Sequence, residues 1–158
     1  RHIRPRWAHW VIRCPVRTIT VQFQDFPDRC LQSAQEHASD TTSLISRLEE
    51  IRRAFLPRVD HPIGVNLLDE SGNSMSIGLG ANSWLLIFTR VDQNAVPLDQ
   101  LHSVGEHDGD STVRFCFSET DEFRGSYLVP RALAEAAVCE WATAGTLSNQ
   151  IRWAYEGE

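Results

Sequence analysis

Hydrophobic and polar residues alternate in several short stretches of this chain, which is the pattern of half-buried strands. Residues 18–24 alternate without a break and place Ile19, Val21 and Phe23 on the apolar side. The same alternation returns in four further stretches, at residues 63–67, 74–79, 112–117 and 151–155. Residues 84–88 are apolar throughout, which is typical of a central strand covered on both faces.

Two other stretches have the period of amphipathic helices. Apolar residues recur every three or four positions over 41–56, after a suitable N-cap at Asp40 and before the helix breaker Pro57. The pattern predicts a second helix that begins at Pro130 and ends at Gly145. Its expected apolar stripe consists of Leu133, Ala137, Trp141 and Ala144.

The stretches between these elements have no clear period. Residues 29–39 are polar and ambiguous, and residues 89–111 predict a long loop. Strands joined by short turns, with helices set apart, indicate an α+β fold. We expect an antiparallel sheet of about six strands packed by two helices.

The length of 158 residues suits one domain. All 15 basic residues are arginines, and five of them lie within residues 1–17, where there is no acid. We therefore expect a flexible basic extension over 1–17 and a single domain over 18–158. That domain has 10 basic and 21 acidic residues, which argues against binding to nucleic acid. No apolar run approaches the roughly 20 residues that span a bilayer, so we expect no membrane partner.

The four cysteines show no Cys-x-x-Cys spacing. Cys116 and Cys139 fall within predicted elements, where free thiols behave as small hydrophobic groups. We see no secretory signal pattern and expect a cytoplasmic protein.

The patterns that resemble catalytic or ligand motifs have simpler explanations. Gly78-Leu79-Gly80 has strands on both sides, whereas a phosphate-binding loop leads into a helix, so it indicates close contact with a neighbour such as Trp84. No serine elbow and no metal-ligand spacing is present. We interpret one cluster of His and acidic residues as a solvated loop: His102, Glu106, His107, Asp108 and Asp110. We therefore expect no catalytic residue, no metal and no cofactor.

The segment from 91 to 123 has a strongly one-sided charge, with eight acids against the single base Arg114. A patch of one sign attracts a partner of the opposite charge, although an acidic surface can also serve solubility alone. We expect six of these acids to contact a basic protein partner: Asp92, Glu106, Asp108, Asp110, Asp121 and Glu122.

The chain resembles the first-numbered immunity-protein family of bacterial polymorphic toxin systems. The resemblance covers about residues 19–155 and rests on the order and spacing of short motifs. These are Gly78-Leu79-Gly80, Trp84-Leu85-Leu86-Ile87-Phe88, Ser103-Val104-Gly105, Val113-Arg114-Phe115-Cys116-Phe117, Leu128-Val129-Pro130 before an Ala-rich helix, and Ile151-Arg152-Trp153.

The resemblance implies a small cytoplasmic protein, without catalytic residues, that binds a secreted toxin and protects the producing cell. The toxins of this family are often nucleic-acid deaminases, whose substrate cleft is basic. The implied function is inhibition by covering that cleft. Two other classes stay open on the residues alone, a secretion chaperone or adaptor and a small α+β enzyme.

Overall fold

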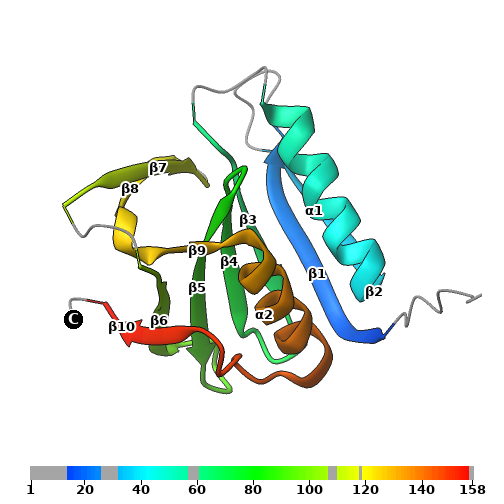
Figure 1. Ribbon diagram of the computed structural model, residues 1–158. Helices are drawn as coiled ribbons and strands as arrows, with labels where there is room; N and C mark the ends of the chain where they lie inside the picture. The colour runs from blue at the N-terminus through cyan, green and yellow to red at the C-terminus, as the bar shows by residue number, and fades with distance from the viewer. Residues whose placement is uncertain (1–13, 26–31, 57–60, 107–109, 118, 157–158) are drawn as a thin grey trace, which may run out of the picture.

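The described part of this protein has ten strands, and two α-helices lie against one side of its large sheet (Figure 1). The computed structural model describes residues 14–25, 32–56, 61–106, 110–117 and 119–156. Its elements are β1 (Pro15–Asp25), β2 (Gln32–Asp40), α1 (Thr41–Phe55), β3 (Gly64–Leu68), β4 (Ser74–Leu79), β5 (Ser83–Val91), β6 (Pro97–Val104), β7 (Thr112–Cys116), β8 (Thr120–Arg124), the 3₁₀ turn η1 (Gly125–Tyr127), β9 (Leu128–Pro130), α2 (Arg131–Ala144) and β10 (Arg152–Tyr155).

Eight of the strands form one sheet in the order β10-β6-β5-β4-β3-β1-β2, with β9 also paired to β5. All the strand pairings in this sheet are antiparallel. Strands β6 and β9 share one edge of β5, because β6 pairs with residues 87–91 and β9 with residues 83–85. The remaining two strands, β7 and β8, form a separate hairpin. The α+β class and the antiparallel sheet are therefore confirmed.

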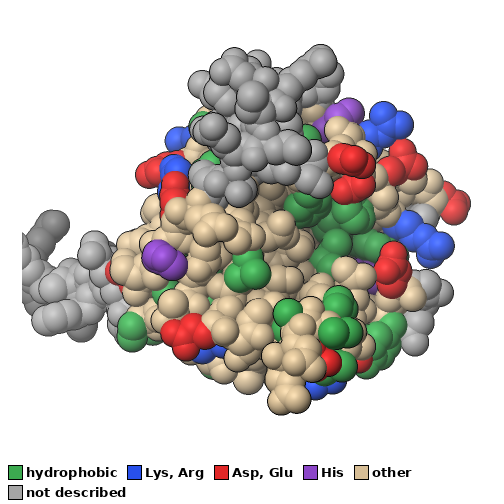
Figure 2. Space-filling model, turned by 180° about the vertical axis from the view of Figure 1, so that it is seen from behind, with side chains coloured by type: hydrophobic (Ala, Val, Ile, Leu, Met, Phe, Trp, Pro, Cys, Tyr) green, Lys and Arg blue, Asp and Glu red, His purple; other side chains and the backbone are tan. Residues whose placement is uncertain are grey.

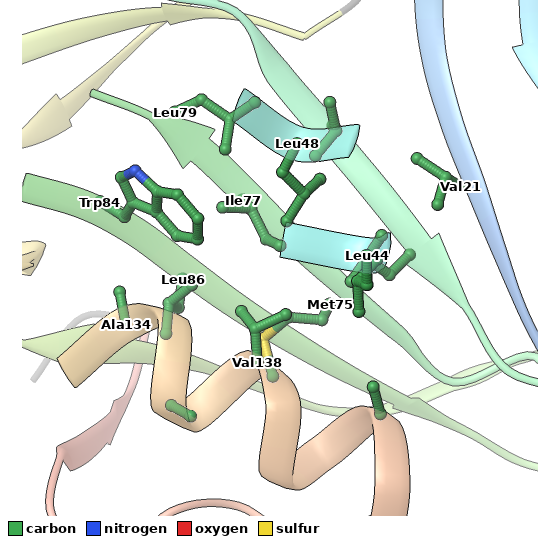
Figure 3. Close-up of a cluster of buried hydrophobic side chains, with 14 of the residues drawn as sticks. Val21, Leu44, Leu48, Met75, Ile77, Leu79, Trp84, Leu86, Ala134 and Val138 are labelled. Carbon is green, nitrogen blue, oxygen red and sulfur yellow. The ribbon is translucent and has the colours of Figure 1, made fainter. Parts of the chain in front are cut away.

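The hydrophobic core lies between the helices and one face of the sheet, here called the covered face (Figure 3). Helix α1 buries Leu44, Leu48, Ile51 and Phe55, as its period predicted. The Asp40 carboxylate accepts a hydrogen bond from the Ser43 amide at 2.7 Å, which confirms the N-cap. Each fully buried large aliphatic side chain contributes about 1.5–3 kcal/mol. Neither described α-helix is long and apolar enough to cross a bilayer.

Helix α2 has its predicted bounds but a different apolar stripe. Gly145 adopts the left-handed conformation, with φ of 73°, that ends the helix. Leu133 and Ala144 are exposed, whereas the buried residues are Ala134, Ala137, Val138, Trp141 and Ala142. Because the helix is rich in alanine, its sequence does not specify which side faces the core. Packing against the sheet determines that side.

The expected boundary between residues 17 and 18 is wrong, because β1 begins at Pro15. The Arg17 guanidinium donates to the Trp141 carbonyl at 2.7 Å and to the Asp69 carboxylate at 3.2 Å. It also lies 5.3 Å from the centre of the Trp141 ring. Arg17 therefore ties β1 to the end of α2, where a cation complements the helix dipole. The rest of the expected extension, residues 1–13, lies outside the described residues.

Two stretches without a predicted strand contain long strands. Residues 32–40 form β2, and residues 97–104 form β6 inside the expected loop over 89–111. Strand β2 pairs only with β1, so it lies at the edge of the sheet. The short strands β8 and β9 were not predicted either. The described side chains of β2, β6 and β8 include no buried apolar residue, and β9 has only three residues, so none of these strands shows the alternation of a half-buried strand.

Candidate binding surface on the open face

The second face of the sheet, here called the open face, lies opposite both α-helices. The strand register places Gln22, Asn66, Ser76, Ile87 and His102 in one row across it. The first four of these side chains are half-buried, and the Ser76 hydroxyl donates to the Asn66 amide oxygen at 2.6 Å. Figure 2 shows uncharged polar groups and backbone over much of this face, and a hydrophobic patch with acidic side chains at its margin.

The hairpin of β7 and β8 crosses one end of the open face. Gly64 and Gly78 are paired in β3 and β4, and aromatic rings occupy the space that their side chains would fill. A Cβ on Gly78 would lie 2.8 Å from the Phe115 ring, and one on Gly64 would lie 2.2 Å from the Phe117 ring. The centroid of the Phe123 ring is 6.3 Å and 6.0 Å from those of the two rings. Aromatic packing on glycine therefore fixes the hairpin to the sheet.

Asp92, one of the predicted partner contacts, lies apart from the others. It follows β5 at the turn into β6, where its carboxylate accepts hydrogen bonds from the amides of Asn94 and Val96 at 2.8 and 3.0 Å. Glu106 follows the opposite end of β6, roughly 25 Å away at the usual rise of a strand. The Asp92 carboxylate therefore shapes a turn, and the structure does not bring it together with the other acids.

Four of the predicted contacts lie on the hairpin or beside its base. Asp121 and Glu122 are exposed on β8, and Glu122 pairs with Arg114 of β7 at 3.2 Å. Glu106 and Asp110 are exposed and lie next to η1. The amide of Gly105 donates to the Ser126 carbonyl, and the amide of Gly125 donates to the Ser111 carbonyl, both at 2.7 Å. The sixth predicted contact, Asp108, lies outside the described residues.

A small cavity lies where the hairpin meets the open face. Its volume is about 120 Å³, and it is formed by two strands of the sheet, the hairpin, η1 and the end of β10. The lining residues are Ile87, Gln100, His102, Phe123, Tyr127 and Glu156. A larger hollow of about 510 Å³ lies on the β10 side and shares His102 and Tyr127 with the cavity.

His102 is 5% exposed, so the expected solvated loop is wrong at this position. Its ring stacks on the Tyr127 ring, with centroids 3.6 Å apart and planes 16° from parallel. Nδ1 lies 3.0 Å from the carbonyl oxygen of Ser103, whereas Nε2 is buried and has no hydrogen-bond partner among the described residues. A buried polar atom without a partner is uncommon in folded proteins and calls for an explanation.

The side chain of Ser103 fixes the backbone next to the stacked rings of His102 and Tyr127. Its side chain is fully buried at the point where β6 leaves β5 and β9 takes its place. The hydroxyl donates to the Tyr127 carbonyl at 2.6 Å and accepts from the Leu86 amide at 3.1 Å. One hydroxyl therefore links β5, β6 and η1, and it fixes the backbone that presents Tyr127 to His102.

Two thiols of the described chain, Cys116 and Cys139, are poorly suited to nucleophilic chemistry. Burial raises the pKa of Cys116 above its ordinary value, and it raises the pKa of Cys139 to about 11. Only the thiolate is a good nucleophile, so both groups are unreactive near neutral pH. Among the described residues, no group of three His, Cys, Asp or Glu side chains is placed to hold a metal ion.

The residues that form the cavity were not predicted from the sequence. His102 was assigned to a loop, and Phe123 and Tyr127 were not considered. One feature of the sequence could have indicated this packing. Two glycines lie in predicted strands, and the phenylalanines at 115, 117 and 123 could fill the space above them. The paired position of Gly64 and Gly78 depends on strand register, however, and the sequence does not state that register.

Comparisons with known proteins do not assign the chain to a family. No protein-family model matches it, and no curated protein is significantly similar to it. The resemblance to the immunity-protein family therefore stays a prediction.

Proposed function

We propose that this protein is an immunity protein that binds and neutralises a cognate secreted toxin in the cytoplasm of the producing cell. The toxin is a nucleic-acid deaminase, and the immunity protein inhibits it by covering its substrate cleft. The chain acts by binding and not by catalysis. The observation that carries the proposal is a hairpin with the exposed acids Asp121 and Glu122, fixed to the sheet beside a cavity on a face that neither α-helix covers.

Charge supports a basic partner. Glu106, Asp121 and Glu122 are exposed at or near the hairpin, and of these three only Glu122 pairs with an arginine of the described chain. An enzyme that acts on nucleic acid must present a basic cleft, and complementary charge speeds the encounter of two proteins. Because glycine–phenylalanine packing anchors the hairpin, little ordering of the backbone is required on binding.

The shape of the region also suits a protein partner. Strong protein interfaces concentrate their affinity in a desolvated pocket that is surrounded by a polar rim. Here the pocket has aromatic walls from Phe123 and Tyr127, and Phe123 lies on β8 next to the exposed acids Asp121 and Glu122. The half-buried polar row of the open face provides the flat surface around it.

The first experiment is a pull-down from the native host with this protein as bait and a moderate salt wash. We expect mass spectrometry to recover the C-terminal domain of one large secreted protein. Addition of the bait should then abolish the deaminase activity of that domain. Recovery of many unfolded clients by a stable dimer would instead support a chaperone. A captured domain that stays fully active would contradict neutralisation.

A charge reversal tests the role of the hairpin in the captured complex. Asp121→Arg should lower the association rate several-fold at low salt, and the difference should shrink as salt screens the charges. Glu70→Arg is a matched control, because Glu70 is exposed in the β3–β4 turn, which joins the strand ends away from Gly64 and Gly78. Equal association rates for both variants and the unchanged protein would show that the hairpin does not guide the partner.

A further inference from the structure

The residues that line the cavity between the hairpin and the open face favour a particular kind of ligand, and acidic charge is only one of the reasons. The central residue of the cavity, His102, has one ring nitrogen that is bonded and one that is not. The carbonyl oxygen of Ser103 can only accept a hydrogen bond, so Nδ1 must carry the proton and donate. In the neutral ring Nε2 then has a free lone pair, and the buried atom lacks a donor.

The other walls of the cavity favour a positively charged donor. Glu156 places a carboxylate at the cavity, and the side chain of Gln100 adds an amide oxygen that can accept a hydrogen bond. Phe123 and Tyr127 contribute aromatic rings, whose faces attract cations. No arginine is among the described residues that line the cavity, so none of them competes for these acceptors.

The geometry favours a guanidinium over an ammonium group. A guanidinium is planar, stacks against aromatic rings and offers five donors, so it can serve Nε2 and a carboxylate at the same time. An ammonium is a compact and strongly hydrated charge that loses more on entering a partly apolar cavity. The volume of about 120 Å³ greatly exceeds the roughly 10–15 Å³ that one water molecule needs.

We propose that this cavity is a binding site for a guanidinium group, supplied by an arginine side chain of the partner protein. His102 Nε2 accepts a hydrogen bond from it, the Glu156 carboxylate neutralises its charge, and the aromatic rings enclose it. The source of the arginine rests on the proposed function, whereas the chemistry of the cavity rests only on the residues that line it.

The cavity is tested without a partner by titrating the full chain with ethylguanidinium chloride. We expect weak binding, with a dissociation constant on the order of millimolar for so small a ligand. The NMR signal of His102 Nε2 should move on binding, and sodium chloride at equal ionic strength should not move it. Ethylammonium chloride should bind more weakly. An Nε2 signal that already shows a hydrogen bond, and that the probe leaves unchanged, would mean that water alone fills the cavity and would overturn the proposal.

Two phenylalanine variants separate the role of His102 from general surface effects. H102F keeps an aromatic ring against Tyr127 but removes the acceptor, and it should weaken probe binding by about tenfold. H37F is the matched control, because His37 is an exposed histidine on the same face, on β2. It should leave binding unchanged. H102F removes a buried unpaired atom but also the Nδ1–H donor of the Ser103 carbonyl, so its unfolding midpoint should be slightly below that of the unchanged protein. If H102F does not fold, E156Q serves as the second variant and should weaken binding severalfold.

The same variants in the captured toxin complex distinguish the two proposals. H102F should raise the dissociation rate of the complex about tenfold, and H37F should leave it unchanged. If the probe binds at His102 but the host contains no captured toxin, the proposed function fails and the cavity chemistry stands. If the toxin is captured and neutralised equally by H102F, and the probe does not bind, the guanidinium site is wrong and the proposed function stands.

Discussion

The two faces of the sheet differ although they come from the same strands. On β5, Trp84 and Leu86 point to the covered face and are fully buried under the helices. Ile87 and Thr89 on the same strand point to the open face and are half-buried, next to polar neighbours. The covered face supplies the stability of the fold, since large buried apolar side chains are the main favourable contribution to folding. The open face has no comparable cover except at the hairpin.

The two faces also differ in the polar groups that they hold. Near the covered face Glu49 and Arg131 form an ion pair at 3.0 Å, which joins α1 to α2. Among the described residues, His102 Nε2 on the open face is buried without a hydrogen-bond partner, as is Arg17 Nε beside α2. A face that is polar, rigid and incompletely satisfied is what a binding surface requires before its partner arrives. The sheet therefore has the core of the protein on one side and, on the other, a polar and incompletely covered surface, which we propose as the interface with the partner.

The largest expected effect breaks the covered face alone. Trp84→Ala removes a fully buried ring and the hydrogen bond from its indole N–H to the Gly80 carbonyl at 3.1 Å. We expect it to lower the free energy of unfolding by about 3–5 kcal/mol, measured by urea denaturation. Thr89→Ala, on the open side of the same strand, should change it by less than about 0.5 kcal/mol. Equal losses for the two variants would contradict the division into a core face and an interface face.

A smaller effect is expected where the hairpin rests on the sheet. In Gly78→Ala the new methyl group would lie 2.8 Å from the Phe115 ring, so the ring must move. We expect a loss of about 1–3 kcal/mol, as for other overpacked sites. Amide hydrogen exchange should quicken in β7 and β8 while it stays slow in β4 and β5. Ser74→Ala, on the same face of β4, is the control and should leave the exchange of the hairpin unchanged.

The sequence predicts the elements of the covered face better than those that lie away from it. Elements that pack on the covered face, such as α1 and β4, have a strong apolar period because one side of each is buried. Strand β6 has no such period: of its residues only His102 and Ser103 are buried, and both are polar. Its strand structure comes from hydrogen bonding to β5 and β10. Strand β10 is distant in sequence, and the pairing with β5 depends on the strand register. Long-range pairing of this kind overrides local propensity.

The candidate site was predictable only in its charge. A count of acids along the chain located the hairpin, because Asp121 and Glu122 are exposed there. The same count wrongly grouped them with Asp92, which lies near the opposite end of β6 and stabilises a turn. Nearness in sequence is not nearness in space within an antiparallel sheet, where two residues at opposite ends of one strand are well separated. The cavity around His102 depends on register and packing, which no local pattern contains.

The smallest expected effect concerns the charges that join the two helices. Hydrogen bonds from Arg52, and then from Arg53, hold the pKa of Glu49 at about 2, well below its ordinary value, against the opposing effect of burial. Because the folded-state pKa is depressed, the ionised carboxylate stabilises the fold above about pH 4.5, and this contribution is lost as the pH falls toward 2. Glu49→Gln should therefore lower the free energy of unfolding by about 1 kcal/mol at pH 7.

The difference between Glu49→Gln and the unchanged protein should shrink steadily when denaturation is repeated at pH 5, 4 and 3. Glu50→Gln is the matched control, since Glu50 is its neighbour on α1 but has a side chain that is 67% exposed. Its effect should stay within about 0.5 kcal/mol. A difference for Glu49→Gln that does not change with pH would mean that packing of the side chain, and not its charge, joins the helices. In that case apolar contacts alone would stabilise the covered face. The paired charges between the helices would then not distinguish it from the hairpin.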